Sequence, residues 1–259
     1  MQEYEAGILR TECCGQNIHI LELSCNGIAS KIIPGQFVQV RAGKGTDPFL
    51  RRTFSVCRAD PNRGIITLLV DEVGPGTAFV CSLKRGESLN VIGPLGAGFN
   101  LEYGIQGSSL LVGGGTGAAP LVFLANTLIS SGAGMVTFLE GARTDSALRF
   151  IDGLVDKGIV VLKATDDGSS GFYGMVSELL EQKIDSIKPN AIYTCGPHAM
   201  MKTIIRIAES RALPCQVSLE ERMACGIGAC LGCAVLLKDG RMVRSCVDGP
   251  VFNASEIVL

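Results

Sequence analysis

The 259-residue chain contains no tryptophan, only two histidines and few other aromatic residues. Its net charge of −2 gives no excess of basic residues, so we expect no nucleic acid partner. The most apolar stretches, 110–112 and 118–125, are separated by glycines, so the chain offers no uninterrupted membrane span. The first ten residues are acidic and lack an apolar core, so we expect no signal peptide and a cytoplasmic, reducing location.

What the chain does contain is apolar residues and cysteine. Hydrophobic residues make up 47% of the sequence, which supports real cores and argues against disorder. The length suits two compact domains, or one domain with an appendage. Eleven cysteines are many for a reducing compartment, where disulfides are rare. A cysteine cluster in this chain therefore indicates metal binding.

The first hundred residues show short runs with β character, separated by turn signals such as Pro34-Gly35 and residues 62–64. Examples of these runs are residues 18–23, 37–40 and 65–70. Short strands at this spacing predict a small antiparallel barrel.

From about Ser108 the pattern changes to alternating strands and helices. The expected strands are 109–112, 135–139, 159–162 and 191–194, and the expected helices are 119–129, 146–156, 176–182 and 198–210. This alternation predicts a parallel sheet covered on both faces. The remainder, from about Pro214, is too short to rely on a hydrophobic core alone, and a metal centre would add the missing stability.

The most specific pattern in the chain is a set of four cysteines near its end. These are Cys225, Cys230, Cys233 and Cys246. The gaps of 4, 2 and 12 residues begin as in plant-type [2Fe-2S] proteins. Gly226, Gly228 and Gly232 allow a tight loop that brings N–H groups near sulfur. A turn at residues 238–240 would return the fourth cysteine on a compact hairpin.

Two other interpretations of the cysteines stay open. A four-cysteine zinc site favours paired knuckles with two-residue gaps in both halves, which this loop does not have. The set could also be inert structural cysteines. The six cysteines that stand singly or in apolar runs are expected to be small buried hydrophobes: Cys13, Cys14, Cys25, Cys57, Cys81 and Cys215.

A glycine-rich turn follows the expected strand 109–112. It consists of Gly113, Gly114, Gly115, Thr116 and Gly117. A helix start after bare glycines favours a pyrophosphate, but the spacing is not a clean G-x-G-x-x-G, so an ordinary βα turn remains possible. The loop 165–169 and the run Cys195-Gly196-Pro197 follow two further strands at the same kind of edge. Three such loops together favour a ligand site.

Two segments of the first part carry groups suited to phosphate. Arg51 and Arg52 begin the run that continues through Thr53-Phe54-Ser55, and a guanidinium can pair with a phosphate there. Residues 74–77 could present backbone N–H groups to the same anion. The alternative is two surface turns and a solvated arginine pair.

These segments together resemble the ferredoxin-NADP reductase superfamily. In that family an R-x-[FYI]-S strand and a later G-x-G-T loop bind flavin, and a G-G-G-x-G-x-x-P turn and a C-G-P motif bind the pyridine nucleotide. The cysteine segment, with residues 218–226 before it and 248–252 after it, looks like that of the electron-transfer subunits of class 1B dihydroorotate dehydrogenases. The resemblance covers nearly the whole chain.

The resemblance implies the site residues. FAD contacts would be Arg52, Thr53, Phe54, Ser55, Leu69, Val70, Asp71, Gly76 and Thr77. NAD contacts would be residues 113–117 with Cys195, Gly196 and Pro197, and the cluster ligands would be the four cysteines. The family usually has proline at Thr53, and an aromatic then a basic residue at Val70-Asp71, so flavin stacking and a charge contact are lost or moved. No acid–base residue is expected, and His198 is read as a helix-start residue.

The resemblance also implies the architecture, a multidomain β plus α/β fold. A FAD-binding antiparallel β-barrel domain would span 1–102, a NAD-binding α/β domain with a parallel sheet 103–212, and a small [2Fe-2S] domain 213–259.

Glu140 could bind the ribose hydroxyls of NAD, whereas Arg143 could meet a 2′-phosphate.

The implied function is electron transfer in UMP biosynthesis. Electrons would leave the FMN of a dihydroorotate-oxidising partner subunit, in a heterotetramer, and pass through the cluster and FAD to NAD⁺. A flavin must lie between the other two groups because nicotinamide exchanges hydride whereas the cluster takes single electrons. The alternatives are a subunit of another NAD(P)H-linked oxidoreductase, of ferredoxin:NADP reductase or sulfite reductase type, a non-enzymatic redox sensor, or a zinc-stabilised binding protein.

Overall fold

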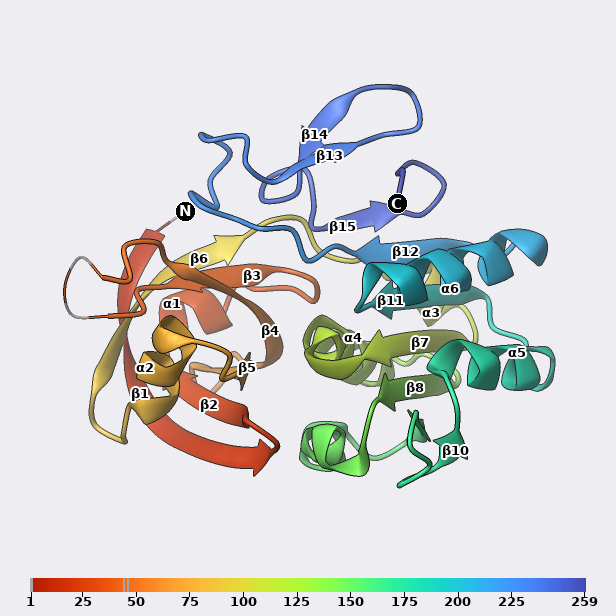
Figure 1. Ribbon diagram of the computed structural model, residues 1–259, viewed down its shortest axis with the longest axis horizontal. Helices are drawn as coiled ribbons and strands as arrows, with labels where there is room; N and C mark the ends of the chain where they lie inside the picture. The colour runs from red at the N-terminus through yellow and green to blue at the C-terminus, as the bar shows by residue number, and fades with distance from the viewer. Residues whose placement is uncertain (1, 44, 46) are drawn as a thin grey trace.

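The computed structural model describes residues 2–43, 45 and 47–259. Figure 1 shows a barrel at the left, a sheet with helices at the right, and a small hairpin segment above them. The architecture is thus the expected combination of an antiparallel barrel, a parallel sheet and a small C-terminal part. In the described part of the chain the longest α-helices have 13 residues, too few to cross a membrane.

The barrel closes in the strand order β1-β2-β5-β4-β3-β6, with β6 pairing back to β1. Its strands are β1 (Gln2–Gly15), β2 (Ile18–Ser24), β3 (Phe37–Val40), β4 (Arg52–Asp60), β5 (Ile65–Asp71) and β6 (Ser88–Leu95). Alternation along β2 explains its two faces: Leu21 and Leu23 fill the barrel, whereas Ile18 and Ile20 face outward into a second core. The short runs of the sequence therefore did predict the barrel.

Two short helices cover the barrel. These are α1 (Asn26–Ala29) and α2 (Pro75–Ser82). Ile28 of α1 and Val80 of α2 are buried in the same core as the barrel interior. Pro75 starts α2 as the first helical residue, where its missing N–H costs nothing.

The second part is a sheet of order β10-β9-β8-β7-β11-β12-β15. Its strands are β7 (Ser109–Gly114), β8 (Val136–Ala142), β9 (Ile159–Thr165), β10 (Phe172–Tyr173), β11 (Ala191–Cys195), β12 (Cys215–Ser218) and β15 (Val251–Asn253). All neighbours are parallel except the last pair. The chain leaves β7 toward β8 and later returns to β11 on the other side of β7. Open α/β sheets bind ligands at such a switch of strand order.

Helices cover both faces of this sheet. They are α3 (Glu102–Ile105), α4 (Ala118–Ser130), α5 (Val176–Ile187) and α6 (His198–Ser210), with 3₁₀ turns η1 (Gly115–Gly117), η2 (Asp145–Ala147) and η3 (Arg149–Gly153). The expected helix over 146–156 is wrong, since only the two 3₁₀ turns form there. The buried Asn126 side chain donates to the Leu154 carbonyl at 2.8 Å and accepts from the Asp156 N–H at 2.9 Å, which ties the chain down beyond η3.

Helix α4 joins the sheet to the barrel. Leu121 and Leu124 lie in one buried cluster with Phe138 of the sheet and with Ile20 and Leu69 from the outer face of the barrel. Because the core is shared, the two parts form a continuous packed body rather than two bodies on a linker.

The C-terminal part contains the hairpin of β13 (Ala234–Leu236) and β14 (Met242–Arg244), which turns around residues 238–240 as expected. Its apolar side chains share a small core with α6, in which Val235 and Leu237 pack near Ile205. The strands on either side of it, β12 and β15, belong to the large sheet. This segment therefore borrows much of its hydrophobic support from its neighbours.

Candidate cofactor-binding site

A cavity of about 970 Å³ lies where the carboxyl edge of the sheet faces the barrel. Asn17 and Asp71 line it from the barrel, and Gly115, Pro197 and Asp166 from the loops after β7, β11 and β9. The three loops singled out in the sequence thus do meet at one edge. Sequence reasoning missed Asn17, whose position in the β1–β2 turn carries only a turn signal.

The loops after β7 and β11 touch backbone to backbone. A Cβ at Gly117 would lie 2.8 Å from the Gly196 Cα, and one at Gly196 would lie 3.1 Å from the Gly114 Cα. These glycines are therefore required by the contact between the two loops. At Gly115 the backbone is left-handed, with φ of 59°, and a Cβ there would meet only open space. This part of the turn faces the cavity and leaves room for a ligand.

Cys195 ends β11 with its side chain fully buried on the α4 face of the sheet. Burial, and to a smaller extent the charge of Glu220, raise the pKa of its thiol well above the ordinary value. Ser218, its neighbour in β12, offers it a hydrogen bond. A protonated, buried thiol can line a nicotinamide site but cannot act as a nucleophile at neutral pH.

Glu140 does not lie where the sequence suggested. It ends β8 with its side chain fully buried beneath the glycine turn, where it would collide with any side chain at Gly113. Neither carboxyl oxygen makes a hydrogen bond of good geometry. Burial raises the pKa of the group well above its usual range, against a smaller opposing effect of the Gly115 N–H. The expectation that Glu140 binds ribose hydroxyls is therefore wrong for this conformation. Arg143, by contrast, is exposed and lines the cavity.

The predicted flavin residues come together around the start of α2. A Cβ at Gly76 would lie 2.7 Å from the Arg52 Nε, so glycine lets the guanidinium approach the helix. Thr77 accepts hydrogen bonds from the N–H groups of Val73 and Gly74, which fixes the turn. The N–H groups of Gly76 and Thr77 lack intrahelical acceptors because they belong to the first turn. A guanidinium beside free N–H groups suits a pyrophosphate.

The remaining flavin candidates differ in accessibility. Val70 is fully buried inside the barrel, so its side chain cannot stack on a ring outside, and Phe54 also packs against this core. Leu69 faces α4. Asp71 lines the cavity, and desolvation raises the pKa of its carboxyl. Ser55 is half-buried in β4.

The four cysteines of the C-terminal loop are all free thiols arranged as two pairs. The Cys225 thiol contacts that of Cys230, and the Cys246 thiol contacts that of Cys233. One tetrahedral zinc ion would hold all four sulfur atoms about 3.8 Å apart. In these described residues no three of the sulfur atoms lie within 4.8 Å of one another. Two pairs suit two metal ions, which favours the two-iron cluster over zinc.

Backbone N–H groups point at these sulfur atoms. The Gly228 N–H donates to Cys246 at 3.2 Å, and the Cys230 N–H to Cys225 at 3.4 Å. N–H groups, that of Ile227 foremost, lower the pKa of Cys225 to about 6. Donors of this kind stabilise thiolate and sulfide charge, so the loop fits a cluster with thiolate ligands.

The cysteine loop is seated on the barrel. Cys233 and Cys246 are buried against Phe37 of β3 and Leu95 of β6. Below the loop, the buried Gln39 of β3 donates to the Thr53 hydroxyl at 3.3 Å and to the Ala224 carbonyl at 3.5 Å. Gln39 thus connects the predicted flavin strand to the residue before the first cysteine. Sequence reasoning missed it, since a lone glutamine in a strand carries no signal.

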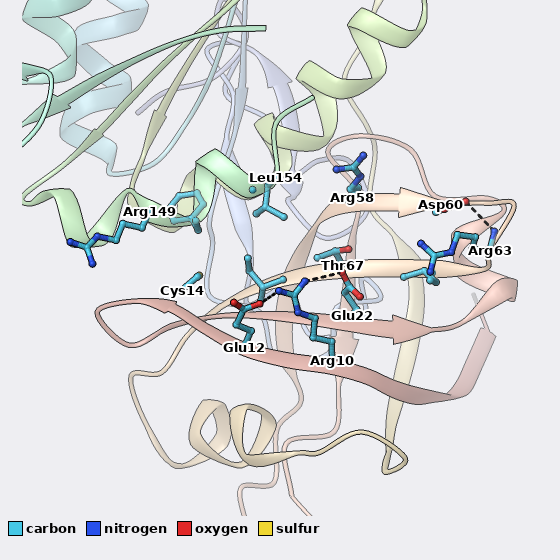
Figure 2. A pocket seen from close by; sticks show the side chains of 14 residues that line it. Arg10, Glu12, Cys14, Glu22, Arg58, Asp60, Arg63, Thr67, Arg149 and Leu154 are labelled. Atoms are coloured by element: carbon cyan, nitrogen blue, oxygen red, sulfur yellow. Dashed lines mark hydrogen bonds and ion pairs between the residues drawn. The ribbon is translucent and has the colours of Figure 1, made fainter. Parts of the chain in front are cut away.

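A second cavity, of about 470 Å³, lies between the barrel and η3. Figure 2 shows four arginines in its lining, Arg10, Arg58, Arg63 and Arg149. Three of them, Arg10, Arg58 and Arg149, form ion pairs with carboxylates of the chain. Arg10 pairs with Glu12, and Arg58 lies 2.7 Å from Asp156. Because these charges are compensated within the chain, the cavity offers little attraction to an anionic cofactor.

The barrel, the cavity at the sheet edge and the paired cysteines define the class: an iron–sulfur electron-transfer oxidoreductase with the ferredoxin reductase fold. Residues 220–258 match the iron-sulfur cluster binding domain of dihydroorotate dehydrogenase B. The dihydroorotate dehydrogenase B (NAD(+)), electron transfer subunit of Desulforamulus reducens is 39% identical over 259 residues, 98% of either chain. The chain belongs to the family of dihydroorotate dehydrogenase B electron transfer subunits.

Further comparisons agree. The subunit of the same name from Geobacillus sp. (strain WCH70) is 36% identical over 262 residues, the full length of both chains. The solved NADH-dependent reduced ferredoxin-NADP oxidoreductase superposes with a TM-score of 0.87 at 30% identity, over 98% of this chain and 89% of that one. The ferredoxin reductase of carbazole 1,9a-dioxygenase, with a TM-score of 0.70 at 23% identity over 82% of this chain and 67% of that one, shares the fold.

Replacing Glu140 with Gln should change how stability depends on pH. The folded-state pKa of Glu140 is raised, so the folded chain keeps a proton that the unfolded chain releases above the ordinary glutamate pKa of 4.5. Wild type should therefore lose stability, relative to Glu140→Gln, as pH rises from about 4.5, by at most about 1.4 kcal/mol per pH unit. Urea unfolding without nucleotide, followed by circular dichroism, measures this. The exposed Glu181→Gln should follow wild type; parallel curves for Glu140→Gln would refute the buried, protonated state.

Replacing Gln39 with Leu should loosen the cysteine loop. The change leaves the part-buried Thr53 hydroxyl and Ala224 carbonyl without their donor, which costs about 1 kcal/mol. Iron should then pass faster to an added chelator than it does from wild type. The exposed Gln182→Leu on α5 is the control and should release iron at the wild-type rate. Equal rates for both variants would mean that the Gln39 contacts contribute nothing to holding the loop.

Proposed function

We propose that this chain exchanges electrons between NAD⁺ and a partner subunit that oxidises dihydroorotate to orotate, using bound FAD and a [2Fe-2S] cluster. The observation that carries the proposal is the seating of the paired cysteines on β3, whose neighbour β4 bears the predicted flavin residues. The nucleotide cavity opens on the side of the barrel that faces the sheet. This arrangement supports a flavin that lies between the cluster and the nicotinamide.

The flavin is assigned to the face of β4 and the first turn of α2. Arg52 and the N–H groups of Gly76 and Thr77 would hold its pyrophosphate, and Thr53, Phe54, Ser55, Leu69, Val70 and Asp71 would contact the rest through side chain or backbone. When bound, FAD supplies the change between hydride transfer and single-electron transfer. Because position 70 has no aromatic side chain, this residue cannot stack on the flavin ring.

The pyridine nucleotide is assigned to the carboxyl edge of the sheet. Residues 113–117 and the first turn of α4 would bind its pyrophosphate, and Cys195, Gly196 and Pro197 would bound the nicotinamide end. The buried Cys195 thiol keeps water away from this end without donating a proton. Preference for NAD⁺ over NADP⁺ cannot come from Glu140, which is buried, and is assigned here from the family.

Three functional domains are proposed within this continuous body: residues 1–102 for FAD, 103–212 for NAD and 213–259 for the cluster. The last of these contributes β12 and β15 to the nucleotide-binding sheet. Electron transfer between the sites then needs no domain rearrangement within the chain, because α4 fixes the barrel against the sheet.

The partner is assigned to the surface around the cysteine loop. Ile227 and Leu231 stand in this loop with 45% and 63% of their surface exposed, and Val247 follows the last cysteine at 43%. Exposed apolar side chains gathered around a redox centre mark an interaction site. The proposed partner is the FMN-containing catalytic subunit, in a cytoplasmic heterotetramer with this chain.

A second candidate partner follows from the similarity to NADH-dependent reduced ferredoxin-NADP oxidoreductase. In that case the same surface would meet another redox subunit, and dihydroorotate would not be oxidised. Mixing the purified chain with the dihydroorotate-oxidising subunit separates the two, since only the proposed function predicts NAD⁺ reduction that depends on dihydroorotate.

Replacing Cys230 with Ser should uncouple the two ends of the chain. The variant loses a cluster ligand, so dihydroorotate-dependent NAD⁺ reduction by the assembled complex should fall by more than about tenfold. Dye reduction by NADH should stay near wild type, because it needs only the flavin and nucleotide sites. Iron, sulfide and FAD contents of anaerobically purified protein accompany both assays. Cys14→Ser, outside the loop, is the control; a normal coupled rate in Cys230→Ser would contradict the route.

Replacing Ile227 with Glu should weaken assembly with the partner. A carboxylate placed in an apolar contact surface must be desolvated on binding, which should raise the dissociation constant by at least about tenfold. Val160→Glu on β9 is the matched control, because Val160 is also 45% exposed and lies away from the loop. Analytical ultracentrifugation of both variants with the partner gives the affinities. Unchanged assembly of Ile227→Glu, with iron content intact, would place the interface elsewhere.

A further inference from the structure

Three side chains from separate segments converge beside α2. His19 lies on β2 opposite Val70 of β5, and Glu72 directly follows β5, where its N–H donates to the Asn17 carbonyl at 2.8 Å. Cys81 lies in the last turn of α2 and packs against the barrel core. None of the three belongs to the residues assigned above to flavin, nucleotide or cluster.

Their potential ligand atoms form one compact group. The His19 Nε2, a Glu72 carboxylate oxygen and the Cys81 Sγ all lie within 4.8 Å of one another. His19 Nε2 and Glu72 Oε2 are 3.1 Å apart. Ligand atoms around one tetrahedral zinc ion are separated by about 3.3–3.6 Å, given the usual Zn–N, Zn–O and Zn–S distances. The group therefore needs only small side-chain movements to close around an ion.

The surroundings suit a zinc site with three protein ligands and a water molecule in the fourth position. Cys81 is buried, the His19 side chain is 16% exposed, and the Glu72 side chain is 39% exposed. Water can thus reach the site from the Glu72 side and complete a fourth coordination position. One imidazole, one thiolate and one carboxylate form a mixed nitrogen, sulfur and oxygen set, which suits Zn²⁺ and disfavours Ca²⁺ and Mg²⁺.

The same residues do not suit nucleophilic catalysis. Burial, and then the charge of Glu72, raise the pKa of the Cys81 thiol to about 12. A thiol of this kind is inert as a nucleophile at neutral pH. A metal ion can still bind it by displacing the proton, since coordination is coupled to deprotonation.

We propose that His19, Glu72 and Cys81 form a zinc-binding site that clamps α2 to the barrel. The ion would link β2, the end of β5 and the last turn of α2. The first turn of the same helix carries Gly76 and Thr77, so the clamp would hold the helix whose start is assigned to the flavin pyrophosphate. The zinc site is separate from the cysteine loop and does not depend on the identity of the redox partner.

The test is equilibrium dialysis of the cluster-loaded flavoprotein against buffered micromolar Zn²⁺, under anaerobic conditions. Zinc, iron and FAD are then quantified in the same sample. Wild type should bind one zinc ion per chain with its iron content unchanged. His19→Gln and Cys81→Ser should each bind zinc at least about tenfold more weakly. Zinc should also raise the melting temperature of wild type and leave that of both variants unchanged.

Cys14→Ser is the matched control. Cys14 belongs to the same β1–β2 hairpin, but its thiol bonds to the Ile18 carbonyl and lines the other cavity. This variant should bind zinc as wild type does. An unchanged far-ultraviolet circular dichroism spectrum shows that each variant is folded. Absence of zinc from wild type, equal binding by all variants, or zinc that rises only as iron is lost would each overturn the proposal.

Discussion

The chain must hold four sulfur atoms in two pairs with a loop that has almost no hydrophobic core of its own. Two features replace that core: N–H groups aimed at sulfur, and the seating of Cys233 and Cys246 on the barrel. The left-handed backbone at Gly226 brings the loop against Gln39, where no side chain would fit. The position of the barrel therefore determines where the cysteine loop lies, and β4, which bears the predicted flavin residues, is one strand further along.

Helix α4 holds the barrel and the sheet in a fixed relative position. This helix fills the space between the sheet and the outer face of the barrel, and its first turn follows the glycine loop at the cavity. One element thus orders the loop that is predicted to bind nucleotide and fixes the distance from that loop to β4. Electron transfer depends steeply on such distances, so a shared core suits the task better than a flexible linker would.

The sequence predicted features that depend on local patterns. Alternating apolar residues indicated the barrel, the βα alternation indicated the sheet, and cysteine spacing indicated the cluster loop and its hairpin. Features that depend on distant segments could not be predicted. Glu140 is buried because its partner residue in β7 is Gly113, which leaves room for the carboxyl group. The chain after η3 is held in place by Asn126, which lies on α4 and is distant in the sequence. The site roles of residues 52–55, 69–71, 76–77, 113–117 and 195–197 stay predictions, as does the role of the four cysteines as cluster ligands.

The C-terminal segment begins and ends at neighbouring strands of the large sheet. The cysteine loop leaves the sheet after Ser218 in β12 and returns at Val251 in β15, and these two residues are direct partners across neighbouring strands. The whole segment between them is an insertion whose ends already meet. A short hairpin turn can close the same two strands. The fold is thus complete without the insertion, and acquiring or losing a metal centre at this edge requires no change in topology.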